Sequence, residues 1–158
     1  MTPPPPHTVP LLVQMRHNHP LGELAPYFHG LQAGRAIASR CPACARTWFP
    51  PRLQCLDHAG PTDWVELPGS GSVVSVTLTE GELPFGSASA SRAFVLVALD
   101  GAENLAFGRL AEVPDARSDT VLEGRRVWIS RAAGTWPHPS QAACYVFDEA
   151  YRQTELLP

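Results

Sequence analysis

Two short cysteine- and histidine-containing motifs in the first half of the chain constrain its fold more than any other feature. Cys41-Pro42-Ala43-Cys44 and Cys55-Leu56-Asp57-His58 are separated by ten residues, and in each motif two residues lie between the two ligands. A tight turn of this kind holds both ligand atoms on one side, and two facing turns complete a tetrahedron around Zn²⁺. Because protein side chains fill all four positions, the pattern predicts a structural zinc, with no open position for catalysis.

Two alternatives bear on this motif. A redox CxxC normally opens a helix, but here the residues that follow, 46–51, end in Pro50-Pro51, which a helix does not tolerate. We therefore expect residues 47–49 to form a β-finger between the two turns, as in a zinc ribbon. For the fourth ligand, the carboxylate of Asp57 is an alternative to the imidazole of His58, and we expect His58.

The residues around the motif resemble those of the DUF35 family. The resemblance is carried by Tyr27-Phe28-His29-Gly30-Leu31-Gln32-Ala33-Gly34-Arg35, by Arg40 to Cys44, and by Trp48-Phe49-Pro50-Pro51-Arg52 with Cys55. It implies a mainly β chain: an N-terminal helix, a rubredoxin-like zinc ribbon, then a five-stranded OB-fold barrel. One departure is His58, where most members carry a fourth cysteine.

The resemblance also implies a function, because DUF35 proteins are encoded beside thiolase-like enzymes. It implies a non-catalytic accessory subunit of a thiolase-fold acyltransferase, condensing enzyme or aldolase complex. In such a hetero-oligomer with a thiolase-like or ketosynthase-like catalytic subunit, the chain would bridge catalytic subunits and help form the acyl-CoA or acyl-substrate site. The acyl group and the direction of the reaction are not encoded in any motif of this chain.

Length and composition set the domain organisation. We expect an extended Pro-rich arm over residues 1–20, the helix and zinc ribbon over 21–62, and the barrel over 63–158 of this 158-residue chain. No apolar run approaches the roughly 18–20 residues that a membrane span needs. The first ten residues hold four consecutive prolines and no basic segment, so we expect no targeting peptide and a cytoplasmic location.

Residues 24–34 predict a short amphipathic helix, with Leu24, Tyr27, Phe28 and Leu31 at i, i+3, i+4 and i+7. No acidic residue lies between positions 24 and 56, so the ribbon is basic. We expect these features to form a surface for an acidic partner or for the phosphates of CoA; its candidate residues are Tyr27, Phe28, Leu31, Arg35, Arg40 and Arg52. The alternative is that the helix packs on the chain's own ribbon or barrel and that the arginines are solvated.

The second half of the chain has the residue pattern of β-strands. Val74, Val76 and Leu78 alternate with polar residues and predict a half-buried strand, and four more strands are expected at 94–99, 105–110, 127–129 and 143–147. Five strands fit an OB barrel or an SH3-like barrel, and unequal spacing favours the OB order. The small-residue segment Gly81–Ser91 is expected to be a mobile loop.

Nothing in the sequence assembles a nucleophile, a base and an oxyanion site. Cys144 lies among apolar neighbours, as a buried structural thiol does. His138 lies between prolines, and Asp148 and Glu149 would point in different directions. We therefore expect a chain that does not catalyse alone.

Single-stranded nucleic acid is the alternative ligand, because OB barrels often bind it. Such binding needs a basic groove and exposed aromatic rings. The barrel half is acidic, and we expect its aromatic residues to lie in the core, which leaves only Trp128, between Arg126 and Arg131, as a stacking platform. The core set is Phe94, Phe107, Tyr145 and Phe147. We therefore expect no nucleic-acid binding.

Overall fold

A computed structural model describes His7, Val13 and residues 20–79, 92–112, 122–131 and 143–148. Most of the expected arm, the loop at 81–91, His138 and Glu149 lie outside these ranges. The elements are η1 (Gly22–Leu24), α1 (Ala25–Gln32), β1 (Ala36–Arg40), β2 (Thr47–Trp48), β3 (Asp63–Leu67), β4 (Ser70–Thr79), β5 (Arg92–Leu99), β6 (Leu105–Leu110), β7 (Arg126–Ser130) and β8 (Cys144–Phe147). None of the helices in the described part is long and apolar enough to cross a membrane.

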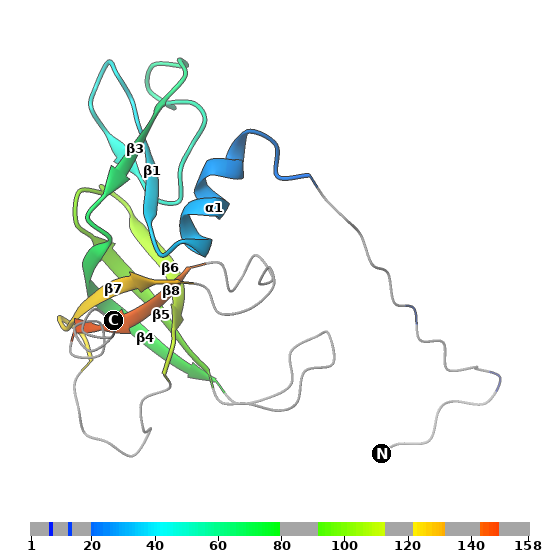
Figure 1. Ribbon diagram of the computed structural model, residues 1–158, viewed down its shortest axis with the longest axis vertical. Helices are drawn as coiled ribbons and strands as arrows, with labels where there is room; N and C mark the ends of the chain where they lie inside the picture. The colour runs from blue at the N-terminus through cyan, green and yellow to red at the C-terminus, as the bar shows by residue number, and fades with distance from the viewer. Residues whose placement is uncertain are drawn as a thin grey trace.

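Helix α1 forms where the amphipathic pattern predicts it. Pro26 lies in its first turn, where a missing N–H costs nothing, and Gly34 follows its end with a φ of 72°. Gly30 allows close approach to β1, since a Cβ there would overlap the side chain of Ile37. Figure 1 shows α1 beside β1, above the barrel.

A three-stranded antiparallel sheet, in the order β2-β1-β3, supports the cysteine-containing loops. Strand β3 pairs with β1 along its full length, from Ala36 opposite Leu67 to Arg40 opposite Asp63. Residues 63–67 therefore belong to the sheet of the ribbon, although we expected the barrel to begin at residue 63. Four of the five β1 residues are buried, so the strand lacks the alternation that marks a half-buried strand in a sequence.

Strands β4 to β8 form a closed barrel in the order β4-β5-β6-β8-β7, with β7 pairing back to β4. Strand β8 lies between β6 and β7 and runs parallel to β6, so the barrel is not a simple meander. This arrangement is OB-like. The expected fold class, a mainly β chain with a short N-terminal helix, a ribbon-type Cys/His cluster and a five-stranded barrel, is confirmed.

On three barrel strands, β4, β5 and β6, side chains that we expected to face the interior face outward. The register between β4 and β5 shifts between Val73 and Ser75, and Val74, at this bulge, is 44% exposed. Strand β5 alternates strictly, so Phe94 faces outward; its neighbour Phe107 on β6 is 50% exposed. The expectation that both phenylalanines are core residues is therefore wrong, whereas Tyr145 is fully buried.

The ribbon and the barrel share one hydrophobic core. Tyr27, Leu31 and Phe49 belong to the same cluster of buried residues as barrel residues such as Val97. At this junction Phe49 N donates to Asn104 Oδ1 at 3.1 Å, and Asn104 Nδ2 donates back to the Phe49 carbonyl at 2.8 Å. A second, smaller cluster contains the buried cysteines of the ribbon with Trp48.

Candidate metal centre

The structure brings together the four side chains that the spacing predicted as ligands. One ligand atom from each of Cys41, Cys44, Cys55 and His58 lies within 4.8 Å of all the others. Cys44 Sγ is 3.9 Å from Cys55 Sγ, and Cys55 Sγ is 3.4 Å from His58 Nδ1. Tetrahedral zinc with Zn–S near 2.3 Å places neighbouring ligand atoms about 3.5–3.8 Å apart, so these distances fit one bound ion. All four cysteines of the chain are free thiols.

The two turns have the same backbone hydrogen bonds. Ala45 N donates to the Cys41 carbonyl at 2.9 Å, and Ala59 N donates to the Cys55 carbonyl at 2.9 Å. Ala45 and Ala59 have positive φ values of 60° and 49°, each directly after the second ligand of its motif. Because this left-handed conformation costs a non-glycine residue roughly 1–2 kcal/mol, two such residues at equivalent positions indicate turns held by their shared ligand geometry.

Asp57, the alternative fourth ligand, is engaged elsewhere. Its carboxylate accepts a hydrogen bond from the Arg46 guanidinium, which also lies 3.6 Å from Glu103. The imidazole of His58, by contrast, directs Nδ1 at Cys41 Sγ, 3.8 Å away, and at Cys55 Sγ. The geometry therefore favours His58 as the fourth member of the cluster.

The electrostatics of the turns favour a thiolate at Cys55. Burial raises the pKa of its thiol, but hydrogen bonds from the backbone N–H groups of Asp57 and His58 and from the side chains of Cys41 and Cys44 lower it, and the net shift is downward. At Cys44 the net shift of the pKa is upward: the backbone N–H of Arg46 lowers it, but burial and the side chains of Cys41 and Cys55 raise it by more. A thiolate is the form that binds a metal, so the surroundings of Cys55 favour that role.

The other residues considered for chemistry have structural contacts. Cys144 is 3% exposed, and burial raises the pKa of its thiol, as expected of an inert core cysteine. Asp148 accepts a 2.8 Å hydrogen bond from Trp128 Nε1, which ties down the indole that we considered as a stacking platform. Within the described ranges these residues do not assemble a nucleophile, a base and an oxyanion site.

Of the helix residues expected to face a partner, Tyr27 and Leu31 turn inward. Tyr27 is 7% exposed and Leu31 is 3% exposed; the Tyr27 ring packs edge-on against Phe49, 5.5 Å away, and against Phe28, 5.1 Å away. Burial raises the pKa of Tyr27 to about 12. Phe28 is partly buried against the same core. Tyr27 and Leu31 therefore pack on their own chain, as the alternative proposed. Their apolar side chains belong to the core that the ribbon and the barrel share.

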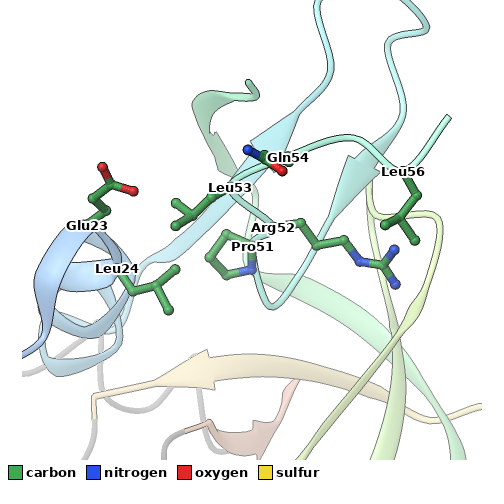
Figure 2. A pocket seen from close by; sticks show the side chains of 7 residues that line it. All are labelled: Glu23, Leu24, Pro51, Arg52, Leu53, Gln54 and Leu56. Carbon is green, nitrogen blue, oxygen red and sulfur yellow. The ribbon is translucent and has the colours of Figure 1, made fainter. Parts of the chain in front are cut away.

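The arginines of the ribbon remain at the surface. Arg35 lies 3.7 Å from Glu66, and Arg40 donates from Nε to Thr47 Oγ1 at 2.9 Å. Arg52 lies over the Trp48 ring at 5.6 Å. Arg52 lines an open groove of about 640 Å³. Figure 2 shows this groove between the start of the helix and the second cysteine turn. The groove is lined by Glu23, Leu24, Pro51, Arg52, Leu53, Gln54 and Leu56.

Sequence reasoning missed the apolar side of this groove. Leu56 lies between the ligands Cys55 and His58 and is 79% exposed, and Leu53 is 39% exposed. The exposure of Leu56 could have been predicted from its place inside a metal-binding turn. In such a turn the ligands point toward the ion, and the residues between them point away from it.

Two solved structures share this fold over most of the chain. One is described as "Ltp2-ChsH2(DUF35) aldolase"; it is 20% identical with a TM-score of 0.58, over 85% of this chain and 98% of that chain. The other, a DUF35-family protein of unknown function from Sulfolobus solfataricus, is 20% identical with a TM-score of 0.56, over 80% of this chain and 87% of that chain. The resemblance to DUF35 proteins is thus confirmed in the fold. No protein-family model matches the sequence, and no curated protein does.

Proposed function

We propose that this chain is a non-catalytic accessory subunit of a thiolase-fold acyltransferase, condensing enzyme or aldolase complex. The observation that carries the proposal is the agreement in fold, over 85% of this chain and 98% of the other, with a DUF35 chain described as part of an aldolase. In this role the chain acts in a hetero-oligomer, where it bridges catalytic subunits and contributes to the acyl-CoA or acyl-substrate site.

The chemistry of the described residues supports an accessory role. The reactive side chains of the ribbon are gathered in the Cys/His cluster, and Cys144 is buried. A four-ligand cluster leaves no position for a substrate or an activated water. We propose that it holds one Zn²⁺ in a structural role, bound by Cys41, Cys44, Cys55 and His58, and that the ion fixes the turn that carries Leu56.

The groove of Figure 2 is our proposal for one contact with the catalytic subunit. It combines two exposed leucines, Leu53 and Leu56, with the guanidinium of Arg52. Apolar anchors beside an arginine are common at the centres of protein interfaces. Arg35 and Arg40 are exposed on the same ribbon, and we propose them as further contacts for an acidic partner or CoA phosphates. Tyr27 and Leu31 contribute by positioning the helix, and not by contact.

The proposal is tested by co-expressing the tagged chain with thiolase-fold proteins from its own genome. We expect a stable heteromeric complex by size-exclusion chromatography, and acyl-CoA turnover by the complex that neither protein achieves alone. Changing Leu56→Ser, with Arg52→Ala as an independent second variant, should weaken the complex at least tenfold, since truncating a central anchor typically costs about 2 kcal/mol or more.

The control is Leu78→Ser, which removes an exposed leucine side chain, 41% exposed, from β4 in the barrel, outside the lining of the groove. Zinc content must be measured for Leu56→Ser, because Leu56 lies between two ligands. Two purified proteins that remain separate, with the partner fully active alone, would overturn the accessory role.

A further inference from the structure

An exposed ion pair connects the two cysteine turns directly. Arg46, just after the first turn, donates from Nη1 to the carboxylate of Asp57, which lies inside the second turn. Their side chains are 52% and 50% exposed. In the described part of the chain, this is the only ion pair between residues 41–46 and residues 55–60. We name it the Arg46–Asp57 latch.

The backbone of each latch residue is hydrogen-bonded to a ligand atom of the cluster. The Arg46 N–H donates to Cys44 Sγ, and the Asp57 N–H donates to Cys55 Sγ. These two sulfur atoms are 3.9 Å apart. The latch therefore crosses the same gap between the turns that the ligand atoms enclose, and each of its ends is fixed to the sulfur on its own side.

Arg46 is also held from the first turn and from the barrel. Its carbonyl accepts a hydrogen bond from Cys41 N at 2.9 Å, and its Nε lies 3.6 Å from the Glu103 carboxylate. Glu103 itself is fixed, because its backbone N donates to the Thr47 carbonyl at 2.9 Å. A side chain that is restrained in this way loses less conformational freedom on meeting Asp57 than a free arginine would lose.

The second turn has few other polar ties to the rest of the protein. The backbone bonds from Cys55 N to Gly60 O, at 3.0 Å, and from Ala59 N to Cys55 O lie within the turn itself. Within the described ranges, the hydrogen bonds and ion pairs that leave residues 55–60 are those of the ligand side chains and that of Arg46. When a ligand side chain detaches, the latch is therefore the polar contact that remains between the turns.

We propose that the Arg46–Asp57 latch holds the second turn beside the first while a ligand side chain is detached, and so slows the loss of metal from the cluster. The inference rests on the proposed zinc site and adds two positioning residues whose side chains are not ligands. An exposed ion pair changes an equilibrium or a rate by about two- to fivefold. The latch therefore affects how fast the metal exchanges, while the four ligands determine how much zinc is bound.

A second ion pair on the ribbon provides a matched comparison. Arg35 lies 3.7 Å from Glu66, and these side chains are 55% and 52% exposed, close to the values for the latch. This pair joins the start of β1 to β3 and includes no residue of either cysteine turn. If exposed ion pairs of the ribbon acted only on its general stability, removing either pair would have the same effect on the cluster.

The test measures the rate at which the zinc-loaded chain transfers its metal to an excess of a chromogenic chelator. At low salt, Arg46→Gln should release zinc about two- to fivefold faster than the wild type, and Arg35→Gln should release it at the wild-type rate. At about 1 M salt, where the screening length is about 3 Å, release should accelerate in the wild type and in Arg35→Gln but not in Arg46→Gln. Adding Asp57→Asn to Arg46→Gln should cause no further acceleration, because both changes remove one contact.

Zinc content and thermal unfolding of each loaded variant establish that it is folded, and Asp57→Asn replaces Arg46→Gln if the latter does not load. Wild-type release rates in both Arg46→Gln and Asp57→Asn would overturn the latch and leave the zinc site intact. The same acceleration at low and at high salt would also overturn it, because Arg46 would then act through packing and not through its charge. A wild-type chain that binds no zinc would overturn the zinc site and the latch together, without bearing on the accessory role.

Discussion

At the scale of single residues, the adjacent residues Asp57 and His58 of the second cysteine turn have different roles. Asp57 and His58 are adjacent and both offer ligand atoms, but Asp57 binds Arg46 and His58 directs Nδ1 into the cluster. The local spacing explains this difference: in each turn the first and fourth residues converge, and the two between them point away. The same geometry exposes Leu56 to solvent.

The first prediction distinguishes the roles of Asp57 and His58 by the zinc content of their variants. Freshly purified wild-type chain should contain about one zinc per chain, because three thiolates and an imidazole form a complete tetrahedral set. His58→Ala should lose most of its zinc on dialysis against a mild chelator, and His58→Cys should keep it. Asp57→Asn, the matched neighbour, should keep its zinc as well. The measurement is elemental analysis, and wild-type zinc in His58→Ala would remove His58 from the site.

At the scale of elements, the connection between β5 and β6 joins the ribbon to the barrel by hydrogen bonds. Asn104 makes two hydrogen bonds to the backbone of Phe49, and Glu103 N donates to the Thr47 carbonyl at 2.9 Å. Phe49 is fully buried, so its backbone groups have little access to water. One asparagine side chain therefore satisfies groups that would otherwise be buried without partners.

The second prediction is that Asn104→Ala lowers the free energy of unfolding by about 1–3 kcal/mol, the cost of leaving buried polar groups unsatisfied. Glu103→Ala is the control, because it removes an exposed ion pair with Arg46 worth about 0–1 kcal/mol. Denaturant unfolding of the zinc-loaded proteins gives both values. Equal, small effects of the two changes would indicate that the junction is held by the packing of Phe49 alone.

At the scale of the whole molecule, the buried residues of the described ranges form two clusters of unequal size. The larger one combines helix, ribbon sheet and barrel, and the smaller one consists of the buried cysteines around Trp48. Without a metal, so small an apolar cluster buries too little surface to offset the entropy of ordering two loops. The metal should therefore stabilise the cysteine turns locally, while the barrel depends on its own core.

The third prediction follows from this division. Removing zinc with a strong chelator should abolish amide protection in residues 41–60 and leave amides of β5 and β6 protected, as measured by hydrogen exchange. Re-adding zinc should restore the turns, which distinguishes metal loss from irreversible damage. Loss of protection throughout the barrel at the same chelator concentration would mean that the turns and the barrel unfold as one unit.

The sequence alone determined those features that depend on local spacing. Two ligands two residues apart predicted the metal cluster, Pro26 and Gly34 bounded the helix, and turn residues with apolar runs located the barrel strands. Each of these follows from the geometry of a few neighbouring residues, and the resemblance to DUF35 proteins supplied the order of the domains.

Only the tertiary structure decided which surfaces are buried. Tyr27 has the same helical spacing whether it faces a partner or its own barrel, and the shared core with Phe49 turned it inward. The sequence pattern predicts Phe107 to be a core residue, but in the closed barrel it lies on the outer surface. Strand β1 lacks alternation because both of its faces are covered, so its pairing with β3 was not predictable. In each case the deciding contact joins residues far apart in the chain, and local periodicity carries no information about such contacts.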